Sequence, residues 1–274
     1  MPQLTVNGAN LHYGDTGSGA ETILFSHGLL MNGEMFGGQV AELSARYRCI
    51  TYDHRGQGRS EVAQDGYDLD SLTNDAIGLI GKLGIAPVHF AGLSMGGFVG
   101  LRLAARHPEL IRSLTLLETS AGPEAPDKVG SYRLLGFIGR WFGYGLVIGR
   151  VMPIMFGTTF LTDPARANER ERWRTFLLKN DRVGIQRALE GVLTRSGVED
   201  ELSRIEVPTL ILVGDEDVAT PPALAERISD GIAGSRLVVI PRAGHSSTIE
   251  QPAAVNAAIS TFLSGLPTPS VPAR

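Results

Sequence analysis

An apolar run, a tight glycine turn and a helical pattern follow one another at residues 88–106, and this stretch limits the possible folds most. Residues 88–91 are apolar, the turn reads Gly92-Leu93-Ser94-Met95-Gly96-Gly97, and the helical pattern continues to Arg106. A strand, a sharp turn and a helix form the context that a G-x-S-x-G nucleophile turn requires. Glycines on both sides of Ser94 suit a strained turn, because a Cβ there would collide with its neighbours. The stretch therefore predicts Ser94 as a nucleophile at the edge of a sheet, with the Met95 amide facing developing negative charge.

The pentapeptide alone also fits an ordinary strand-to-helix turn with a capping serine, so the interpretation depends on partners elsewhere. An activated serine needs a base, and the base needs an orienting acid. Of the six histidines, His245 follows a predicted strand at 237–240 and precedes the last helix, which places it at the same sheet edge as Ser94. A second predicted strand, 209–213, is followed by three candidate acids, Asp215, Glu216 and Asp217.

Buried apolar runs alternate with amphipathic helices along most of the chain, which implies an α/β fold with a mostly parallel sheet covered by helices on both faces. The predicted strands are 3–6, 11–13, 22–26, 49–52, 88–91, 114–117, 209–213 and 237–240. The predicted helices are 39–45, 69–83, 98–106, 222–228 and 253–263.

Residues 127–202 break this alternation, because they contain several helical patterns and no strand-like run. Four helices are expected here, at 129–141, 146–156, 164–179 and 183–194. This pattern predicts a helical cap, 127–202, inserted between the two halves of a core, 1–126 and 203–265. The proline-rich end, 266–274, is expected to be a flexible tail.

Composition sets the outer limits of the interpretation. The chain has 274 residues, 43% of them hydrophobic and 20% charged, as in soluble globular proteins. Its net charge of −4 gives no reason to expect nucleic acid or an anionic membrane as a partner. The single cysteine, Cys49, excludes an intrachain disulfide and a cysteine metal cluster. Without a signal-peptide pattern or an uninterrupted apolar span, a cytoplasmic location is expected, and homodimer formation is left open.

Five motifs together resemble the α/β-hydrolase family, over about residues 23–262. They are His27-Gly28, a D-x-R-G-x-G-x-S loop at 53–60, a G-x-S-M-G-G turn at 92–97, a V-G-x-x-D stretch at 213–217 and Ala243-Gly244-His245. The resemblance implies the α/β-hydrolase fold, selects Asp217 as the acid of the triad, and adds the amide of Leu29 to that of Met95 as an oxyanion hole. The C-terminal half is similar to 3-oxoadipate enol-lactonases, which hydrolyse a small anionic lactone.

The cap is strongly apolar, so one or two of its large side chains are expected to face a substrate. The candidates from the cap are Trp141, Met152, Met155 and Phe156. His27, outside the cap, is a further pocket candidate, although its neighbour Gly28 suggests a structural or oxyanion-loop role.

Two groups of charged residues have structural alternatives. Glu118 follows the predicted strand 114–117, where some members of this fold carry the triad acid, but a strand-end carboxylate bonded to nearby backbone is the preferred interpretation. The charges of the 53–60 loop, on Asp53, Arg55 and Arg59, are expected to brace the loop beneath the site rather than to bind substrate.

The resulting hypothesis is a serine hydrolase that cleaves a small-molecule carboxylic ester or lactone with a hydrophobic part through an acyl-enzyme. No metal or organic cofactor is expected. Enol-lactonase activity, hydrolysis of C–C bonds in dienone-type ring-cleavage products and a cofactor-free haloperoxidase side activity use the same triad and stay open. Dehalogenases and epoxide hydrolases are disfavoured, because they have an aspartate where this chain has Ser94. A non-catalytic small-molecule receptor is disfavoured by the intact set of Ser94, Asp217 and His245.

Overall fold

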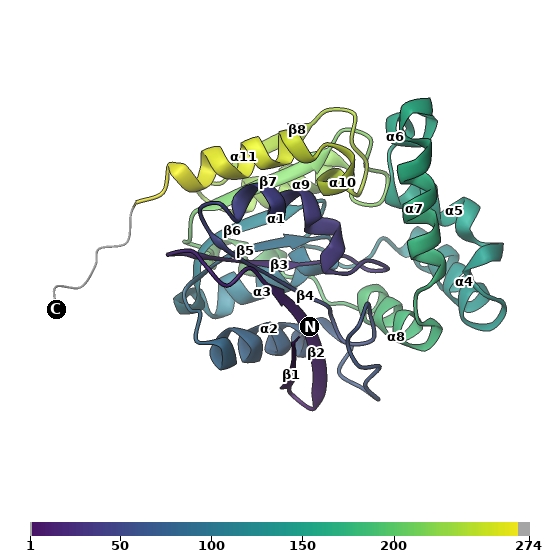
Figure 1. The fold of residues 1–274 in the computed structure, drawn as a ribbon, viewed down its shortest axis with the longest axis horizontal. Coiled ribbons are helices and arrows are strands. Elements are labelled where there is room, and N and C mark those ends of the chain that lie inside the picture. The colour runs from purple at the N-terminus through teal and green to yellow at the C-terminus, as the bar shows by residue number, and fades with distance from the viewer. Residues whose placement is uncertain (1, 268–274) are drawn as a thin grey trace.

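A single eight-stranded sheet forms the centre of the computed structural model, which describes residues 2–267 (Figure 1). The strands are β1 (Gln3–Val6), β2 (Ala9–Asp15), β3 (Thr22–Ser26), β4 (Arg48–Tyr52), β5 (Val88–Leu93), β6 (Ile111–Leu117), β7 (Thr209–Gly214) and β8 (Arg236–Ile240). Their order is β1-β2-β4-β3-β5-β6-β7-β8. The hairpin of β1 and β2 joins antiparallel at the β4 edge, and the strands from β4 to β8 are parallel. The predicted mostly parallel sheet is confirmed.

Helices cover both faces of the sheet, because the strands carry apolar side chains on both sides. Along β3, Ile23 and Phe25 pack into one apolar core and Leu24 packs into the other; this alternation follows from the period of two in a strand. The first core is closed by helices α1 (Gly37–Leu43) and α11 (Pro252–Ser264). The second core is closed by α2 (Leu69–Leu83), α3 (Met95–Arg106) and α9 (Pro222–Gly231).

The segment between β6 and β7 forms a separate group of helices at the carboxyl edge of the sheet, on the right in Figure 1. These helices are α4 (Pro126–Phe142), α5 (Ile148–Met155), α6 (Thr158–Thr162), α7 (Ala167–Leu178) and α8 (Arg182–Leu193). Four of them lie where helices were predicted, and α6 was not expected. The inserted helical cap is therefore confirmed as part of the fold, whereas the residue limits of core and cap stay a prediction.

Several short elements complete the chain. They are α10 (Ser247–Glu250), which was not expected, and the 3-10 helices η1 (Gly33–Phe36), η2 (Pro108–Leu110), η3 (Tyr144–Leu146), η4 (Pro164–Arg166) and η5 (Glu199–Arg204). Within residues 2–267, none of the helices combines the length and the apolar character needed to cross a bilayer. The predicted flexible tail lies, from residue 268 onward, outside the described residues.

The strand order creates a crevice at one point of the carboxyl edge. After β3 the chain passes to β4 on one side, and it then returns to β5 on the other side of β3. The loops after β3 and β5 therefore diverge, and ligands of parallel sheets bind at such a switch point. His27 follows β3 and Ser94 follows β5, so the topology places both candidate motifs at this crevice.

Cys49 is a buried thiol on β4 within the first core. Burial raises the pKa of this thiol to about 11. Because the thiolate is the reactive form, we expect no labelling of the native chain by a dithiobis-nitrobenzoate reagent at about pH 8. The same chain unfolded in guanidinium serves as the control and should release one equivalent of chromophore per cysteine. Fast labelling of the native protein would show that β4 is open to solvent.

Candidate active site

Ser94 occupies a strained turn between β5 and α3. Its backbone has φ 52° and ψ −111°, a conformation that costs a non-glycine residue about 1–3 kcal/mol. Two hydrogen bonds hold it: the Ser94 N–H donates to Leu117 O at 2.9 Å, and Thr119 Oγ1 donates to Ser94 O at 2.9 Å. A Cβ on Gly92 would lie 2.2 Å from Gly96 O, and one on Gly96 would lie 2.0 Å from Ser26 O. A side chain at either glycine would therefore collide with the backbone, as the sequence analysis predicts.

His245 and Asp217 form a directly bonded pair in the loops after β8 and β7. His245 Nδ1 lies 2.9 Å from Asp217 Oδ2, and both side chains are buried. Asp217 also accepts from the Ala219 N–H at 2.8 Å, from the Thr220 N–H at 3.0 Å and from Thr220 Oγ1 at 2.8 Å. Burial opposes ionisation of Asp217, but the adjacent His245 and the Thr220 donors outweigh it and hold the pKa of this carboxyl below its usual value. The carboxylate is thus placed to fix the ring of His245.

Ser94 and His245 line the same pocket beneath the cap. Within residues 2–267, no hydrogen bond joins Ser94 directly to His245, and such bonds often tighten only when substrate is bound. Of the six histidines, His245 alone lines this pocket in the described chain. The structure therefore brings the three predicted residues to one place, with the acid–base pair already formed.

The segment after β3 passes directly beside the serine turn. A Cβ on Gly28 would lie 3.3 Å from the Ser94 Cβ, and Leu29 lines the pocket. Met95 is the first residue of α3, where backbone N–H groups have no partner inside the helix. The predicted oxyanion-hole residues, Leu29 and Met95, thus flank Ser94 from two sides.

Gln57 connects the two sides of this arrangement, and the sequence did not single it out. Its Oε1 accepts from the Leu30 N–H at 2.9 Å, and its Nε2 lies 3.8 Å from the Met95 sulfur. Leu30 has φ 69°, so its backbone needs such support. Gln57 is one of the variable positions of the 53–60 loop, which explains why the motif did not reveal it.

The charges of the 53–60 loop brace it, as expected. Asp53 accepts from the Gly33 N–H and from the Arg59 N–H, both at 2.9 Å. Arg55 donates twice to the buried Asp75, at 2.7 Å each. These contacts fix the loop that carries Gln57.

A model of the alpha/beta hydrolase fold family matches residues 21–252. The chain belongs to the α/β-hydrolase family. The enol-lactonase from Burkholderia xenovorans LB400 superposes with a TM-score of 0.89 and 32% identity, over 96% of this chain and 100% of that chain. A thermophilic esterase from Thermogutta terrifontis has a TM-score of 0.89 and 30% identity, over 96% of this chain and 98% of that one. A Caulobacter protein named as a carbamate hydrolase, RutD, is 26% identical over 92% of this chain and 94% of its own length.

These similarities confirm the resemblance to α/β-hydrolases and to enol-lactonases. They cover nearly the whole of each partner chain, so the cap of this α/β-hydrolase has a counterpart region in its relatives. The names of the relatives include lactone, ester and carbamate chemistry, and these all require attack on an acyl carbon.

The pocket of the α/β-hydrolase has a lining that differs from the predicted one. Of the predicted pocket residues, Met155 lines it. Trp141 is 61% exposed on the outside of the cap, and Met152 is half-buried away from the pocket. Phe156 is buried in the core, where it stacks on Phe160 at 4.8 Å between ring centroids. Expecting these three side chains in the pocket was therefore wrong.

The rotation of the cap helices explains the difference. On α4, Tyr132, Leu135 and Gly136 line the pocket, so positions three and four residues apart form its inner face. Trp141 falls on the opposite face of the same helix. Helices α5 and α8 contribute further apolar side chains to the pocket: Val151 and Ile154 from α5, and Ile185, Leu189 and Val192 from α8. Sequence alone shows that such a helix has apolar residues on two faces, and it does not show which face is covered.

His27 was also expected in the pocket, but it is fully buried behind it. The His54 N–H donates to His27 Nε2 at 2.9 Å, so the ring proton is on Nδ1, which donates to Gly28 O at 2.7 Å. Burial lowers the pKa of His27, which keeps the ring neutral. His27 therefore positions the Gly28-Leu29 segment and does not touch a substrate.

Glu118 is fully buried at the end of β6 with φ 41°. The preferred expectation of a carboxylate bonded to nearby backbone is supported in part, because the Gly214 backbone amide and the Ser247 hydroxyl lie where they stabilise the anion. In the described chain, neither carboxyl oxygen meets strict hydrogen-bond geometry. Burial and the nearby Asp217 charge raise the pKa of Glu118 well above its usual value. In the structure the Nδ1 atom of His245 contacts Asp217, which makes Asp217 and not Glu118 the carboxyl partner of the ring.

Glu250 holds the loop of His245, a role that the sequence analysis did not predict. It accepts from the Gly244 N–H at 3.0 Å, from the Ser246 N–H at 3.1 Å and from the cap residue Gly157 at 2.9 Å. Burial raises the pKa of Glu250 to about 7, against the effect of these donors. The carboxyl thus ties the histidine loop to the start of α6.

The described residues contain no group of three or more histidine, cysteine, aspartate or glutamate side chains that could hold a metal ion.

Gln57→Ala tests whether the bridge between Leu30 and Met95 positions the site. The change leaves the Leu30 N–H without its acceptor, which costs about 1–3 kcal/mol. We expect kcat/KM for a chromogenic ester to fall about tenfold, with KM changing less than kcat. Gln64→Ala, at an exposed position of the same region, is the matched control and should behave like wild type. Unchanged kinetics of Gln57→Ala would show that Leu30 and Met95 hold their places without it.

Proposed function

We propose that this α/β-hydrolase cleaves a carboxylic ester or lactone with a hydrophobic part through an acyl-enzyme formed on Ser94. One observation carries the proposal. Ser94 and His245 open into the same largely apolar pocket, and His245 is held there by the ionised Asp217. A nucleophile, a base and an orienting acid in this arrangement suit acyl transfer.

The reaction follows from the positions of these groups. Ser94 Oγ attacks the carbonyl carbon while its proton passes to His245 Nε2, and the amides of Leu29 and Met95 stabilise the oxyanion. The tetrahedral intermediate collapses as His245 returns the proton to the leaving alkoxide. Water then gives a proton to His245, attacks the acyl-enzyme and releases the acid, and the proton returns to Ser94. Asp217 keeps the imidazole in the required tautomer and stabilises its positive charge in each step.

The lining of the pocket favours a hydrophobic acyl or alcohol part. Most of the side chains that line it are aliphatic or aromatic, and its acidic residue, Glu124, is paired with Arg195 at 3.0 Å. Each methylene that such a surface removes from water contributes about 0.8 kcal/mol.

Lactone hydrolysis is the second candidate, and the similarity to the Burkholderia enol-lactonase favours it. An anionic lactone needs a cation to balance its carboxylate. Among the described residues that line the pocket there is no lysine or arginine. We therefore infer that an uncharged lactone suits this pocket better than a carboxylate-bearing one.

The first test compares p-nitrophenyl acetate, butyrate and octanoate with an uncharged and a carboxylate-bearing enol-lactone. We expect butyrate or octanoate to exceed acetate in kcat/KM, since the apolar pocket rewards each added methylene. Ser94→Ala should lower kcat by about 10⁴-fold or more. Ser131→Ala, at an exposed serine of the cap, is the control. Rapid opening of the lactones with negligible ester turnover would make the protein a lactonase, and activity on none of the substrates would overturn the proposal.

The second test separates Asp217 from Glu118 as the orienting acid. Asp217→Asn should lower kcat by about 10⁴-fold, because the amide favours the wrong tautomer of His245. Glu118→Gln should stay within about threefold of wild type, since the amide has the same shape and the ring of His245 keeps its contact with Asp217. Ester kinetics on both variants, with circular dichroism as a check of folding, give the answer. A large loss in Glu118→Gln with a small one in Asp217→Asn would reverse the assignment.

A further inference from the structure

The outer face of α4 and the turn after it carry a continuous apolar surface that the pocket does not use. Five large side chains here are between 53% and 73% exposed, and we call them the cap patch: Leu134, Phe137, Trp141, Phe142 and Leu146. In the described chain, the other exposed large hydrophobic residues are two single valines, Val218 and Val239. Scattered exposed side chains are normal, but a cluster of this kind marks an interaction site.

The cap patch is built into the helix and is not a frayed end. On α4 the inner face, with Tyr132 and Leu135, lines the pocket, and Phe137 and Trp141 project on the other side. The rings of Phe137 and Phe142 contact each other edge to face, with centroids 6.5 Å apart. The end of α4 is closed by the Gly143 N–H, which donates to Ile138 O and Gly139 O. Most of the patch therefore lies on a regular helix with a capped end.

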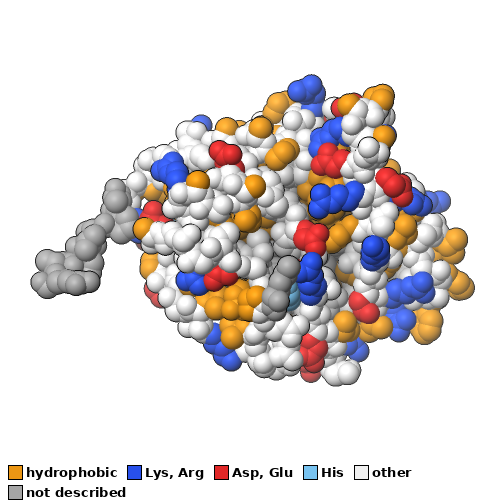
Figure 2. All heavy atoms as spheres, in the orientation of Figure 1, with side chains coloured by type: hydrophobic (Ala, Val, Ile, Leu, Met, Phe, Trp, Pro, Cys, Tyr) orange, Lys and Arg blue, Asp and Glu red, His pale blue; other side chains and the backbone are white. Residues whose placement is uncertain are grey.

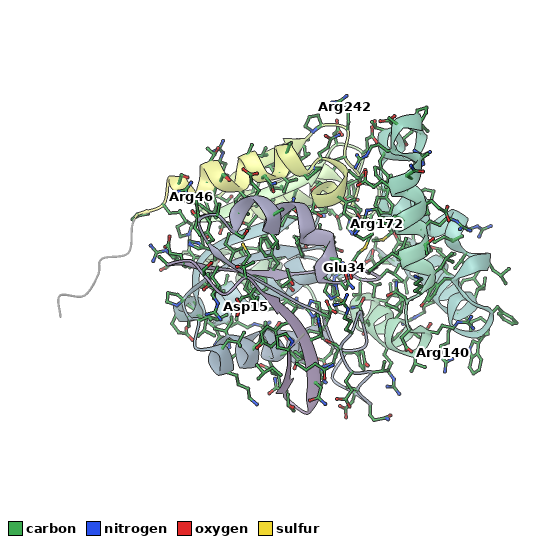
Figure 3. All side chains as sticks on the ribbon, viewed as in Figure 1. Asp15, Glu34, Arg46, Arg140, Arg172 and Arg242 are labelled. Carbon is green, nitrogen blue, oxygen red and sulfur yellow. The ribbon has the colours of Figure 1, made fainter. Side chains whose placement is uncertain are left out.

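Basic residues outnumber acidic ones in the segment that carries the cap patch. Residues 126–162 carry a surplus of three positive charges, from four basic residues and one acidic residue, Lys128, Arg133, Arg140, Arg150 and Asp127. The Arg140 guanidinium lies 4.9 Å from the centre of the Trp141 ring. Figure 2 shows hydrophobic and basic side chains side by side along the rim that the cap forms, and Figure 3 places Arg140 at this outer edge.

Few of these charges are neutralised by neighbours. Arg133 is paired with Glu190 of α8, and Arg182 beside the Gly143 turn has Asp181 next to it in the chain. In the described chain, Arg140 and Arg150 form no ion pair. The surface thus presents aromatic rings together with free guanidinium groups.

We propose that the cap patch docks onto the surface of an anionic lipid bilayer. Aromatic and leucine side chains enter the boundary between headgroups and acyl chains, and arginines remain at the level of the phosphates. Each basic residue near an anionic membrane strengthens binding several-fold at physiological ionic strength. The net charge of the whole chain, −4, conceals this local surplus, which is why composition pointed away from a membrane partner.

A second copy of the chain is the other occupant to consider, and the charges disfavour it. A two-fold interface brings the same patch of both copies together, so Arg140 and Arg150 would face like charges with few carboxylates between them. An anionic lipid surface supplies the opposite sign. The proposal does not depend on the chemistry at Ser94, because docking uses the face of α4 that is turned away from the pocket.

Vesicle binding of the full-length chain tests the proposal. We expect it to sediment with vesicles of equal parts phosphatidylglycerol and phosphatidylcholine, to bind pure phosphatidylcholine about tenfold more weakly, and to be released by added salt. The emission of Trp141 should shift to shorter wavelength on binding, because the other tryptophan, Trp173, is already buried. Ser94→Ala should bind like wild type, so loss of hydrolysis and loss of docking are separate results.

Two pairs of variants and their controls assign the binding to the patch. Trp141→Ser/Phe142→Ser and Arg140→Gln/Arg150→Gln should each lower partitioning onto the anionic vesicles by about tenfold. The matched controls are Val239→Ser and Arg227→Gln/Arg236→Gln, at exposed positions outside the cap, and they should bind like wild type. Absence of binding, equal binding to both kinds of vesicle, or equal loss in the controls would overturn the proposal. A stable dimer that Trp141→Ser/Phe142→Ser disrupts, without vesicle binding, would assign the patch to a second copy.

Discussion

The strained backbone of Ser94 is the constraint on which the rest of the site depends. A non-glycine residue at φ 52° persists only where its surroundings fix it. Here the Ser94 N–H donates to Leu117 O, and the Ser94 carbonyl accepts from Thr119 Oγ1. Gly92 and Gly96 have no Cβ, which lets the turn close. Gly92, Leu117 and Gly96 belong to β5, β6 and α3, and Thr119 follows β6. The two strands carry apolar side chains on both faces of the sheet, and α3 packs on one face. The core therefore stabilises a conformation that directs one hydroxyl into the pocket.

Three buried carboxyl groups lie in this region, and their hydrogen bonds give them different properties. Asp217 accepts from Ala219 and Thr220 and contacts His245, which lowers its pKa in spite of burial. Glu250 accepts three backbone N–H bonds and still has its pKa raised to about 7. Glu118 has no partner in strict hydrogen-bond geometry among the described residues, and burial raises its pKa well above the usual value. The difference follows from the donors and the charge partner available to each group, which sequence position does not reveal.

The sequence predicted the fold and the positions of the motif residues because local rules determine both, whereas the catalytic roles of those residues stay a prediction. The strand, turn and helix around Ser94 and the loops of Asp217 and His245 follow from apolar runs and glycine positions, and their topology brings them together. Gln57 was missed because its partner, the Leu30 N–H, belongs to another loop. Glu250 was missed because it bonds only to backbone groups, those of the nearby Gly244 and Ser246 and of the distant Gly157, and backbone partners leave no signal in the sequence. The pocket side chains were mostly wrong for another reason. A cap helix with apolar residues on two faces can be rotated either way, and only packing against the core decides the rotation.

Helix α4 shows what this ambiguity means physically. Its inner residues Tyr132 and Leu135 line the pocket, so the apolar character of this face has a role in the folded cap. The outer residues Phe137 and Trp141 gain nothing from that packing, and their exposure to water is unfavourable. A cluster of exposed apolar side chains marks an interaction site. Because the Arg140 guanidinium lies against the Trp141 ring, the proposed occupant offers both apolar material and negative charge, and an anionic lipid surface combines the two.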